Sequence, residues 1–217
     1  RALVVAGTVA AAACASPAAG TTTRISLWHA GKARQYRLYV PRGHTMESPA
    51  PLVVVMHGGG GNSRQVERST RMATHADRTG TLVLYPDGVL RTWNAGGCCG
   101  PARRMDVDDV GFVVAAVEDA AERVPVDRTR VYATGMSNGA MMSYRLGCER
   151  PDVFAAIAPV AGTLMTDCRP GRGVPVMHVH GEQDRFVPWE GGVGCGPSRD
   201  SMTGVDVTLD RMAEVAG

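Results

Sequence analysis

Aromatic residues and net charge are both in short supply in this sequence, and each shortage excludes a class of function. Phenylalanine, tyrosine and tryptophan make up 5% of the 217 residues, too few for the base-stacking surfaces of single-strand nucleic-acid binders. The net charge is only +2 and the arginines are scattered along the chain, so no basic face is indicated. We therefore expect no nucleic-acid partner.

Residue patterns that bind metals are also missing. None of the six cysteines stands in a C-x₂-C pair, the usual spacing of zinc ligands. His178 and His180 share one face of a predicted strand, an arrangement that suits either a metal or a packed, hydrogen-bonded pair. We favour the packed pair and expect no metal.

The composition is that of one globular domain, which we place at residues 24–217. Hydrophobic residues make up 44% and charged residues 20% of the chain, enough for a single core of ordinary size. Short apolar runs alternate with helical patterns, which predicts an α/β fold with a mostly parallel sheet and helices on both faces. We expect strands at 24–28, 35–40, 51–56, 81–85, 130–134, 155–161 and 174–179, and helices at 62–78, 109–124, 140–146 and 205–216.

The most informative motif is the G-x-S-x-G run at residues 135–139, between a predicted strand and a predicted helix. In such an elbow the serine is held in a strained turn, and the flanking glycines let the strand and the helix pass closely. Ser137 is the candidate nucleophile.

A second motif precedes it, where an apolar strand runs directly into His57 and four glycines. The N–H groups of Gly59 and Gly60, together with that of Asn138, are the candidate donors to the oxyanion of an acyl-transfer intermediate. A third candidate, Asp184, follows the predicted strand at 174–179. Its place after the serine matches the chain order of serine, acid and histidine, and we interpret it as the triad acid.

Taken together, these motifs resemble the polyhydroxybutyrate depolymerase and feruloyl esterase group of α/β-hydrolases. Further matching segments lie at residues 85–88, 91–100, 108–112 and 180–188, so the resemblance runs from about residue 37 to about residue 194. It implies a serine esterase without metal or organic cofactor, acting on short hydroxyacyl, acetyl or feruloyl esters of a polyester or an esterified polysaccharide. Ser137 would be the nucleophile and Asp184 the acid.

Two other functions stay open at this point. A serine peptidase or acyltransferase would use the same fold and triad, because these do not distinguish amide, ester or acceptor. A noncatalytic surface-binding protein would keep the scaffold without turnover. Catalysis is favoured because a binder has no evident need for the elbow and the glycine loop together.

The sequence departs from the resembled group in its histidines. That group carries the catalytic histidine in a loop near the C-terminus, whereas all six histidines here precede Asp184. His57 belongs to the glycine loop, and His29, His44 and His75 lie in a predicted hairpin, a loop and a helix. We expect a base beyond Gly217, in a continuation of a chain that is incomplete at its C-terminus.

Residues 1–23 read as an export signal and a tether. One arginine is followed by an almost wholly apolar run to Ala13, too short to span a bilayer comfortably. The run Ala11–Ala12–Ala13–Cys14 resembles a lipobox, which predicts that the protein is anchored to the membrane by a lipid on Cys14. The alternative is ordinary signal cleavage after Ala15. Either way we expect a secreted or surface-anchored protein.

Export implies an oxidising compartment, so Cys98, Cys99, Cys148, Cys168 and Cys195 are disulfide candidates. Cys98 and Cys99 are adjacent, and we expect them to bond to two different partners. Two tryptophans near the candidate loops, Trp93 and Trp189, are candidates for lining the substrate pocket or for packing.

Overall fold

The computed structural model describes residues 17–168 and 173–216. Most of the predicted export segment, with Cys14 at its end, lies outside these residues. No helix in the described part of the chain is both long and apolar enough to cross a membrane.

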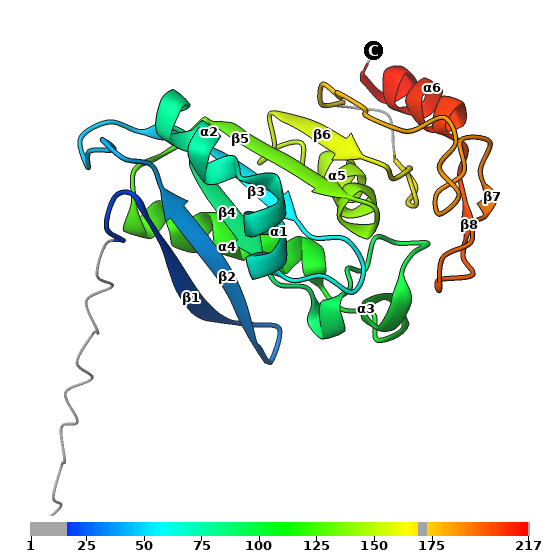
Figure 1. Ribbon diagram of the computed structural model, residues 1–217, viewed down its shortest axis with the longest axis horizontal. Coiled ribbons are helices and arrows are strands. Elements are labelled where there is room, and N and C mark those ends of the chain that lie inside the picture. The colour runs from blue at the N-terminus through cyan, green and yellow to red at the C-terminus, as the bar shows by residue number, and fades with distance from the viewer. Residues whose placement is uncertain (1–16, 169–172, 217) are drawn as a thin grey trace, which may run out of the picture.

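A six-stranded sheet forms the centre of the molecule (Figure 1). Its strands lie in the order β1-β2-β4-β3-β5-β6. The first two pairings, β1 with β2 and β2 with β4, are antiparallel, and the four strands from β4 to β6 run parallel. The predicted, mostly parallel sheet is thus confirmed. The strands are β1 (Thr21–His29), β2 (Lys32–Val40), β3 (Ala50–Met56), β4 (Leu82–Pro86), β5 (Val126–Met136) and β6 (Ala156–Val160).

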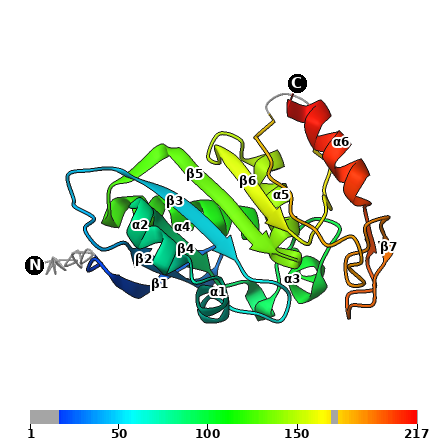
Figure 2. The same ribbon diagram turned by 45° about the horizontal axis from the view of Figure 1, so that its top comes forward.

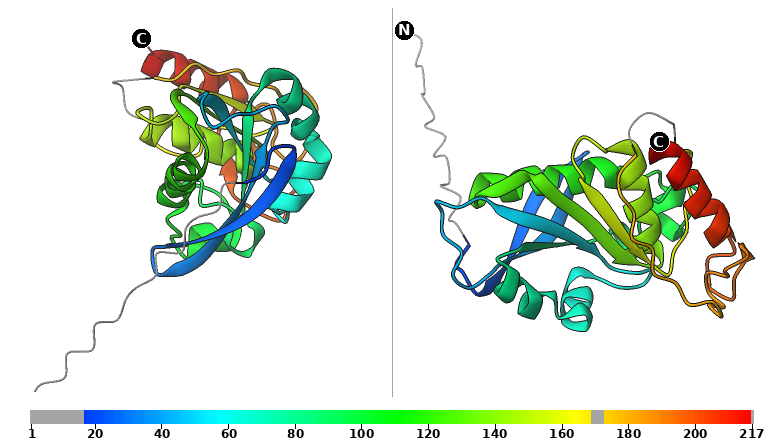
Figure 3. Two further views of the ribbon diagram at one scale, coloured as in Figure 1. Left: turned by 90° about the vertical axis from the view of Figure 1, so that its left-hand side faces the viewer. Right: turned by 90° about the horizontal axis from the view of Figure 1, so that it is seen from above.

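Helices cover both faces of this sheet, as Figure 3 shows. One face carries α1 (Ser63–Thr70) and α2 (Met72–Thr79), and the opposite face carries α4 (Asp109–Arg123) and α5 (Asn138–Glu149). The loop after β4 holds two short helices, η1 (Val89–Arg91) and α3 (Gly100–Arg104).

Covering on both faces explains why β3 and β4 are apolar at every position. In β4, Leu82 and Leu84 join the core under α4 and α5, while Val83 and Tyr85 join the smaller core under α1 and α2. Successive side chains of a strand point to opposite faces, so a strand between two helical layers is hydrophobic throughout.

The predicted helix at 62–78 is two helices, separated at Arg71, whose backbone is left-handed with φ 52°. Ser69 and Thr70 both direct their hydroxyls to the carbonyl of Val66. Side-chain hydroxyls of this kind compete for helical carbonyls, which gives the break a local cause.

The predicted buried strand at 174–179 is instead an extended edge segment. It meets β6 in two isolated bridges, Ile157 with Val176 and Val160 with Val179. Among the described residues β6 is the strand it pairs with, and alternate side chains are exposed, Met177 to 66% and Val179 to 46%. Beyond it lie β7 (Gly192–Val193), β8 (Ser201–Met202) and α6 (Val205–Ala216), at the opposite end of the sheet from β1 (Figure 2).

The two-sided core makes a stability prediction with an internal control. Leu84→Ala removes a fully buried side chain from β4 and should lower the free energy of unfolding by about 2–5 kcal/mol. Leu90→Ala, at a leucine that is 67% exposed, should change it by less than about 0.5 kcal/mol. Urea unfolding followed by circular dichroism measures both. Equal effects would contradict this assignment of the core.

Candidate active site

Ser137 occupies a one-residue turn between β5 and α5. Its backbone has φ 55° and ψ −121°, a conformation that is costly for a residue with a side chain. The turn is held on both sides: the Ser137 N–H donates to the carbonyl of Val160 at 2.9 Å, and the Ser137 carbonyl accepts from Met141 N at 3.0 Å. The predicted strand, turn and helix are therefore present with the strained serine between them.

The glycines at both ends of the motif are required by close packing. A Cβ atom at Gly139 would lie 2.6 Å from the carbonyl oxygen of His57, and one at Gly135 would lie 2.7 Å from the backbone of Gly139. Real Cβ atoms do not approach backbone oxygens so closely, and the expected role of these glycines is confirmed.

The glycine loop lies against the serine. A Cβ built at Gly58 would be 3.6 Å from the Cβ of Ser137. The Gly60 N–H donates to the carbonyl of Arg91 at 2.8 Å, and the Gly61 N–H donates to Gly58 at 2.9 Å. Within the described residues the Gly59 N–H has no such partner. Of the two expected glycine donors, the geometry thus leaves Gly59 available and uses Gly60 to hold the loop.

His57 is a structural residue in a neutral form. Its Nε2 accepts from the N–H of Gly88 at 3.0 Å, so the ring proton resides on Nδ1, which donates to the carbonyl of Gly58 at 2.8 Å. Its ring packs on Trp93, with centroids 4.8 Å apart. Burial lowers the pKa of the imidazole below its usual value.

Trp93 lies in the core, which is the packing role that the sequence analysis gave as one of two alternatives. The ring is fully buried and its indole N–H donates to the His57 carbonyl at 2.9 Å. The backbone of Trp93 makes two hydrogen bonds with the side chain of Asn138: the amide oxygen accepts from Trp93 N at 2.7 Å, and the amide nitrogen donates to Trp93 O at 3.0 Å. The loop after β4 is thereby joined to the elbow.

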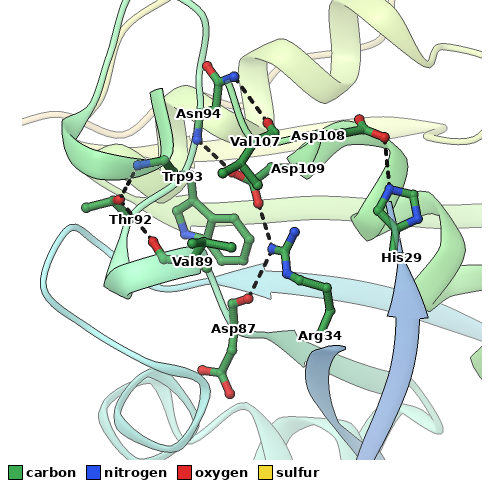
Figure 4. Close-up of polar contacts among 12 residues, drawn as sticks. His29, Arg34, Asp87, Val89, Thr92, Trp93, Asn94, Val107, Asp108 and Asp109 are labelled. Atoms are coloured by element: carbon green, nitrogen blue, oxygen red, sulfur yellow. Dashed lines mark hydrogen bonds and ion pairs between the residues drawn. The ribbon is translucent and has the colours of Figure 1, made fainter. Parts of the chain in front are cut away.

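A buried ion pair fixes the same loop from the other side (Figure 4). Arg34 of β2 donates to the Asp109 carboxylate at 2.6 Å and to the Asp87 carbonyl at 3.2 Å. The second oxygen of Asp109 accepts from the backbone of Asn94 at 2.8 Å. Burial raises the pKa of the Asp109 carboxyl, while the Asn94 hydrogen bond and the Arg34 charge lower it. The neighbouring Asp108 caps α4 by accepting from Gly111 N at 2.8 Å.

Asp184 stands in the loop after the edge segment, close to where the parallel strands end. Its Oδ1 accepts from the N–H groups of Phe186 and Val187, at 2.8 and 3.0 Å, and its other oxygen is 3.9 Å from His180 Nε2. Half-buried Trp189 lies in the same loop and lines a groove of about 710 Å³ with Asp184 and Glu190.

The paired histidines form one directional chain of hydrogen bonds. His180 Nε2 donates to the Val187 carbonyl at 2.8 Å, and its Nδ1 therefore accepts from His178 Nε2 at 3.1 Å. His178 Nδ1 in turn accepts from the Tyr144 hydroxyl at 2.7 Å. The expected hydrogen-bonded pair is confirmed, and burial lowers the pKa of His178.

None of the six histidines, all within the described residues, hydrogen-bonds to Ser137. His29 pairs with Asp108 at 2.8 Å, and the partners of His57, His178 and His180 are those described above. The described part of the chain therefore places a strained serine beside the glycine loop, without a histidine hydrogen-bonded to that serine.

The disulfides differ from expectation. Cys98 is joined to its neighbour Cys99, so these two residues do not bond to separate partners. Both are buried, and the Cys99 sulfur lies 3.7 Å from the sulfur of Met141, whereas Cys195 is exposed and forms no disulfide within the described residues. Cys148 and Cys168 form the second disulfide.

The fold and this elbow define an α/β-hydrolase. A solved thermostable esterase has the same fold, with a TM-score of 0.64 at 21% identity over 90% of this chain and 52% of that one. The chain belongs to the family described as "Esterase PHB depolymerase", whose profile matches residues 34–179.

Two curated relatives carry esterase names. "Putative esterase NocK" of Nocardia uniformis subsp. tsuyamanensis is 36% identical over 175 residues, which cover 79% of this chain and 51% of that protein. "Feruloyl esterase B" of Piromyces equi is 34% identical over 163 residues, covering 70% and 30%. The chain thus spans about half or less of these relatives' lengths.

The ion pair under the loop leads to a prediction. Asp109→Asn leaves the Arg34 guanidinium buried without its counter-charge and should lower the free energy of unfolding by about 3–5 kcal/mol. Asp108→Asn is the matched control, because the pair that Asp108 makes with His29 is partly exposed and asparagine also caps helices; its cost should stay below about 1 kcal/mol. Chemical denaturation compares the two. A small effect at Asp109 would show that the pair does not fix the loop.

Neutral buried histidines predict a loss of stability in weak acid. Burial lowers the pKa values of His44, His57 and His178, so the unfolded chain binds protons that the folded chain does not. Stability should be fully present above about pH 6.5 and fall as the pH drops toward 5, each histidine adding at most about 1.4 kcal/mol per pH unit.

Urea unfolding at pH 7.5, 6.5 and 5.5 tests this dependence. His178→Gln should reduce the slope, with His75→Gln on the exposed surface of α2 as the control substitution. Stability that stays level or rises on acidification across this range would contradict the assignment.

Proposed function

We propose that this chain supplies the nucleophile of a serine carboxylesterase. The enzyme would act on short hydroxyacyl, acetyl or feruloyl esters through an acyl-enzyme on Ser137. The observation that carries the proposal is the pairing of a strained Ser137 with a Gly59 N–H that has no other partner among the described residues. A binding protein has no use for a strained serine beside free backbone donors.

In the proposed reaction the Ser137 oxygen attacks the ester carbonyl, and its proton passes to a histidine base. The N–H groups of Gly59 and Asn138 would stabilise the oxyanion, with Gly60 holding the loop through Arg91. Collapse of the tetrahedral intermediate expels the alcohol, which takes the proton, and water then releases the acid by the same route.

Asp184 would orient the histidine and stabilise its charged form. Its Oδ2 makes no hydrogen bond of 3.5 Å or less within the described chain and is left for such a partner, whereas Oδ1 is already used by Phe186 and Val187. We propose that the histidine comes from a segment outside residues 1–217, since none of the six present hydrogen-bonds to Ser137.

Two grooves offer room for the substrate. One, of about 520 Å³, is lined by the loop after β4 at Gly96 and Gly97, by the segment after β6 at Met165 and Thr166, and by α6 at Val207. The other contains Trp189 and borders Asp184. We propose Trp189 as a substrate-lining residue.

We also propose that the protein is exported and anchored through Cys14. Its substrate would be an ester of a polyester or polysaccharide.

Hydrolysis of p-nitrophenyl acetate tests the nucleophile. The assay uses this chain and the polypeptide that the complete coding sequence specifies. Ser137→Ala should lower kcat/KM at least about 10³-fold, because removing a triad serine abolishes covalent catalysis. Ser143→Ala, on the same helix but buried and bonded to the Gly139 carbonyl, is the control and should retain most activity.

Activity confined to the longer polypeptide would support a base outside residues 1–217. Full activity of this chain alone would show that one of its own histidines serves. Activity that survives Ser137→Ala would overturn the proposal, and faster cleavage of the matching amide than of the ester would indicate a peptidase.

A further inference from the structure

Arginines gather in a groove beside the glycine loop, on the side away from the β6 edge of the sheet. Two adjoining hollows of about 490 and 410 Å³ share Asn62 and Arg64 as lining residues. We call them together the arginine groove, after the four arginines that line it: Arg24, Arg37, Arg64 and Arg68.

These arginines are only partly neutralised. Arg64 and Arg68 are exposed, stand one turn apart on α1, and have no hydrogen-bond or ion-pair partner among the described residues. Two like charges at this spacing disfavour a helix by about 0.2–0.5 kcal/mol. Arg24 uses its Nε to bond the neutral side chain of Gln35 at 3.0 Å.

The acidic groups nearby are already engaged. Glu67 accepts from Arg37 at 2.7 Å and also from Thr22, and Asp87 accepts from the backbone and hydroxyl of Ser63, at 2.7 and 2.9 Å. The groove therefore carries four guanidinium groups against two carboxylates, both of which are committed to other donors. It retains a net positive charge and unused guanidinium donors.

The groove begins at the residue that follows the glycine loop. Asn62 follows Gly61 directly and caps α1 through Gln65 N at 2.9 Å. Asn62 is three positions after Gly59, so the two Cα atoms lie at most about 11 Å apart. The groove therefore starts within reach of an extended substrate whose ester carbonyl lies at the Gly59 N–H.

We propose that the arginine groove binds a carboxylate borne by the substrate at a distance from the ester being cleaved. The inference rests on the proposed esterase function. Guanidinium groups pair with carboxylates through two parallel hydrogen bonds, which suits arginine better than lysine for this task. Cleavage of a hydroxyacyl polyester leaves oligomers that end in a carboxylate, and the groove would hold that end while the next ester lies at Ser137.

Binding to the inactive Ser137→Ala chain tests the groove without requiring turnover. Calorimetry measures the affinity for a 3-hydroxybutyrate trimer as the free acid and as its methyl ester. The free acid should bind about tenfold more tightly, the size expected for charged hydrogen bonds in a partly exposed site. The advantage should shrink when salt is raised from 0.15 to 0.5 M.

The double variant Arg64→Gln/Arg68→Gln should remove most of this advantage and bind the two trimers nearly alike. Arg78→Gln, at an exposed arginine of α2 that lines neither hollow, removes charge elsewhere and should keep the full difference. Equal binding of acid and methyl ester by the parent chain would overturn the proposal. So would an equal loss in the Arg78 variant, since net charge alone would then explain the effect.

A glucuronate-containing oligosaccharide forms the second arm. Preference for it over the trimer, lost in the double variant, would support a carboxylate site and assign the carboxylate to an acidic polysaccharide. Acid-selective binding together with an absence of hydrolysis by the full polypeptide would retain the groove and reject the esterase. Hydrolysis that depends on Ser137, without acid-selective binding, would do the reverse.

Discussion

The buried pair of Arg34 and Asp109 is the constraint on which the arrangement around Ser137 depends. Removing two charges from water is costly, and the cost is offset here by several contacts at once. The Asp109 carboxylate accepts from the guanidinium and from Asn94, while the guanidinium also meets the Asp87 carbonyl and lies 3.7 Å over the ring of Phe112. These contacts tie β2, α4 and both ends of the loop after β4 to one point.

A short series of hydrogen bonds links this ion pair to the elbow at Ser137. Asn94 is fixed by Asp109, its neighbour Trp93 is bonded to Asn138, and Asn138 directly follows Ser137. The indole also holds the His57 carbonyl, where the glycine loop begins. A strained conformation persists only when its surroundings overdetermine it, and Ser137 is held by β6, by α5 and, through this chain of contacts, by the loop.

The sequence predicted what depends on local pattern. Apolar runs and helical spacing located most of the elements, and the glycines of the elbow followed from the close passage of a strand and a helix. The contacts that cross the molecule were missed. That the Gly60 N–H is used by Arg91 depends on how distant segments meet, and so does the choice between core and pocket for Trp93, which the sequence left open. Cys98 and Cys99 are bonded to each other, so the expectation that they bond to two different partners was wrong.

The sequence did contain a signal for one missed contact, the ion pair of Arg34 and Asp109. Arg34 alternates with Tyr36 and Leu38 along β2, and all three face inward. A charged residue on the buried face of a strand requires a buried counter-charge, and Asp109, at the start of an apolar helix, was available. The sequence signal for the helix break at Arg71 is weaker. It consists of the hydroxyls of Ser69 and Thr70, and both residue types also occur inside helices without breaking them.

Asn138 has two roles: its side chain joins the elbow to the loop after β4, and its backbone N–H is the proposed oxyanion donor. Its side chain acts as a short piece of main chain, giving and receiving one hydrogen bond, and both bonds end on backbone atoms of Trp93. The position of the elbow therefore depends on the backbone path of the loop after β4 and not on the loop's exposed side chains. Exposed residues of the loop can therefore change while the serine keeps its position.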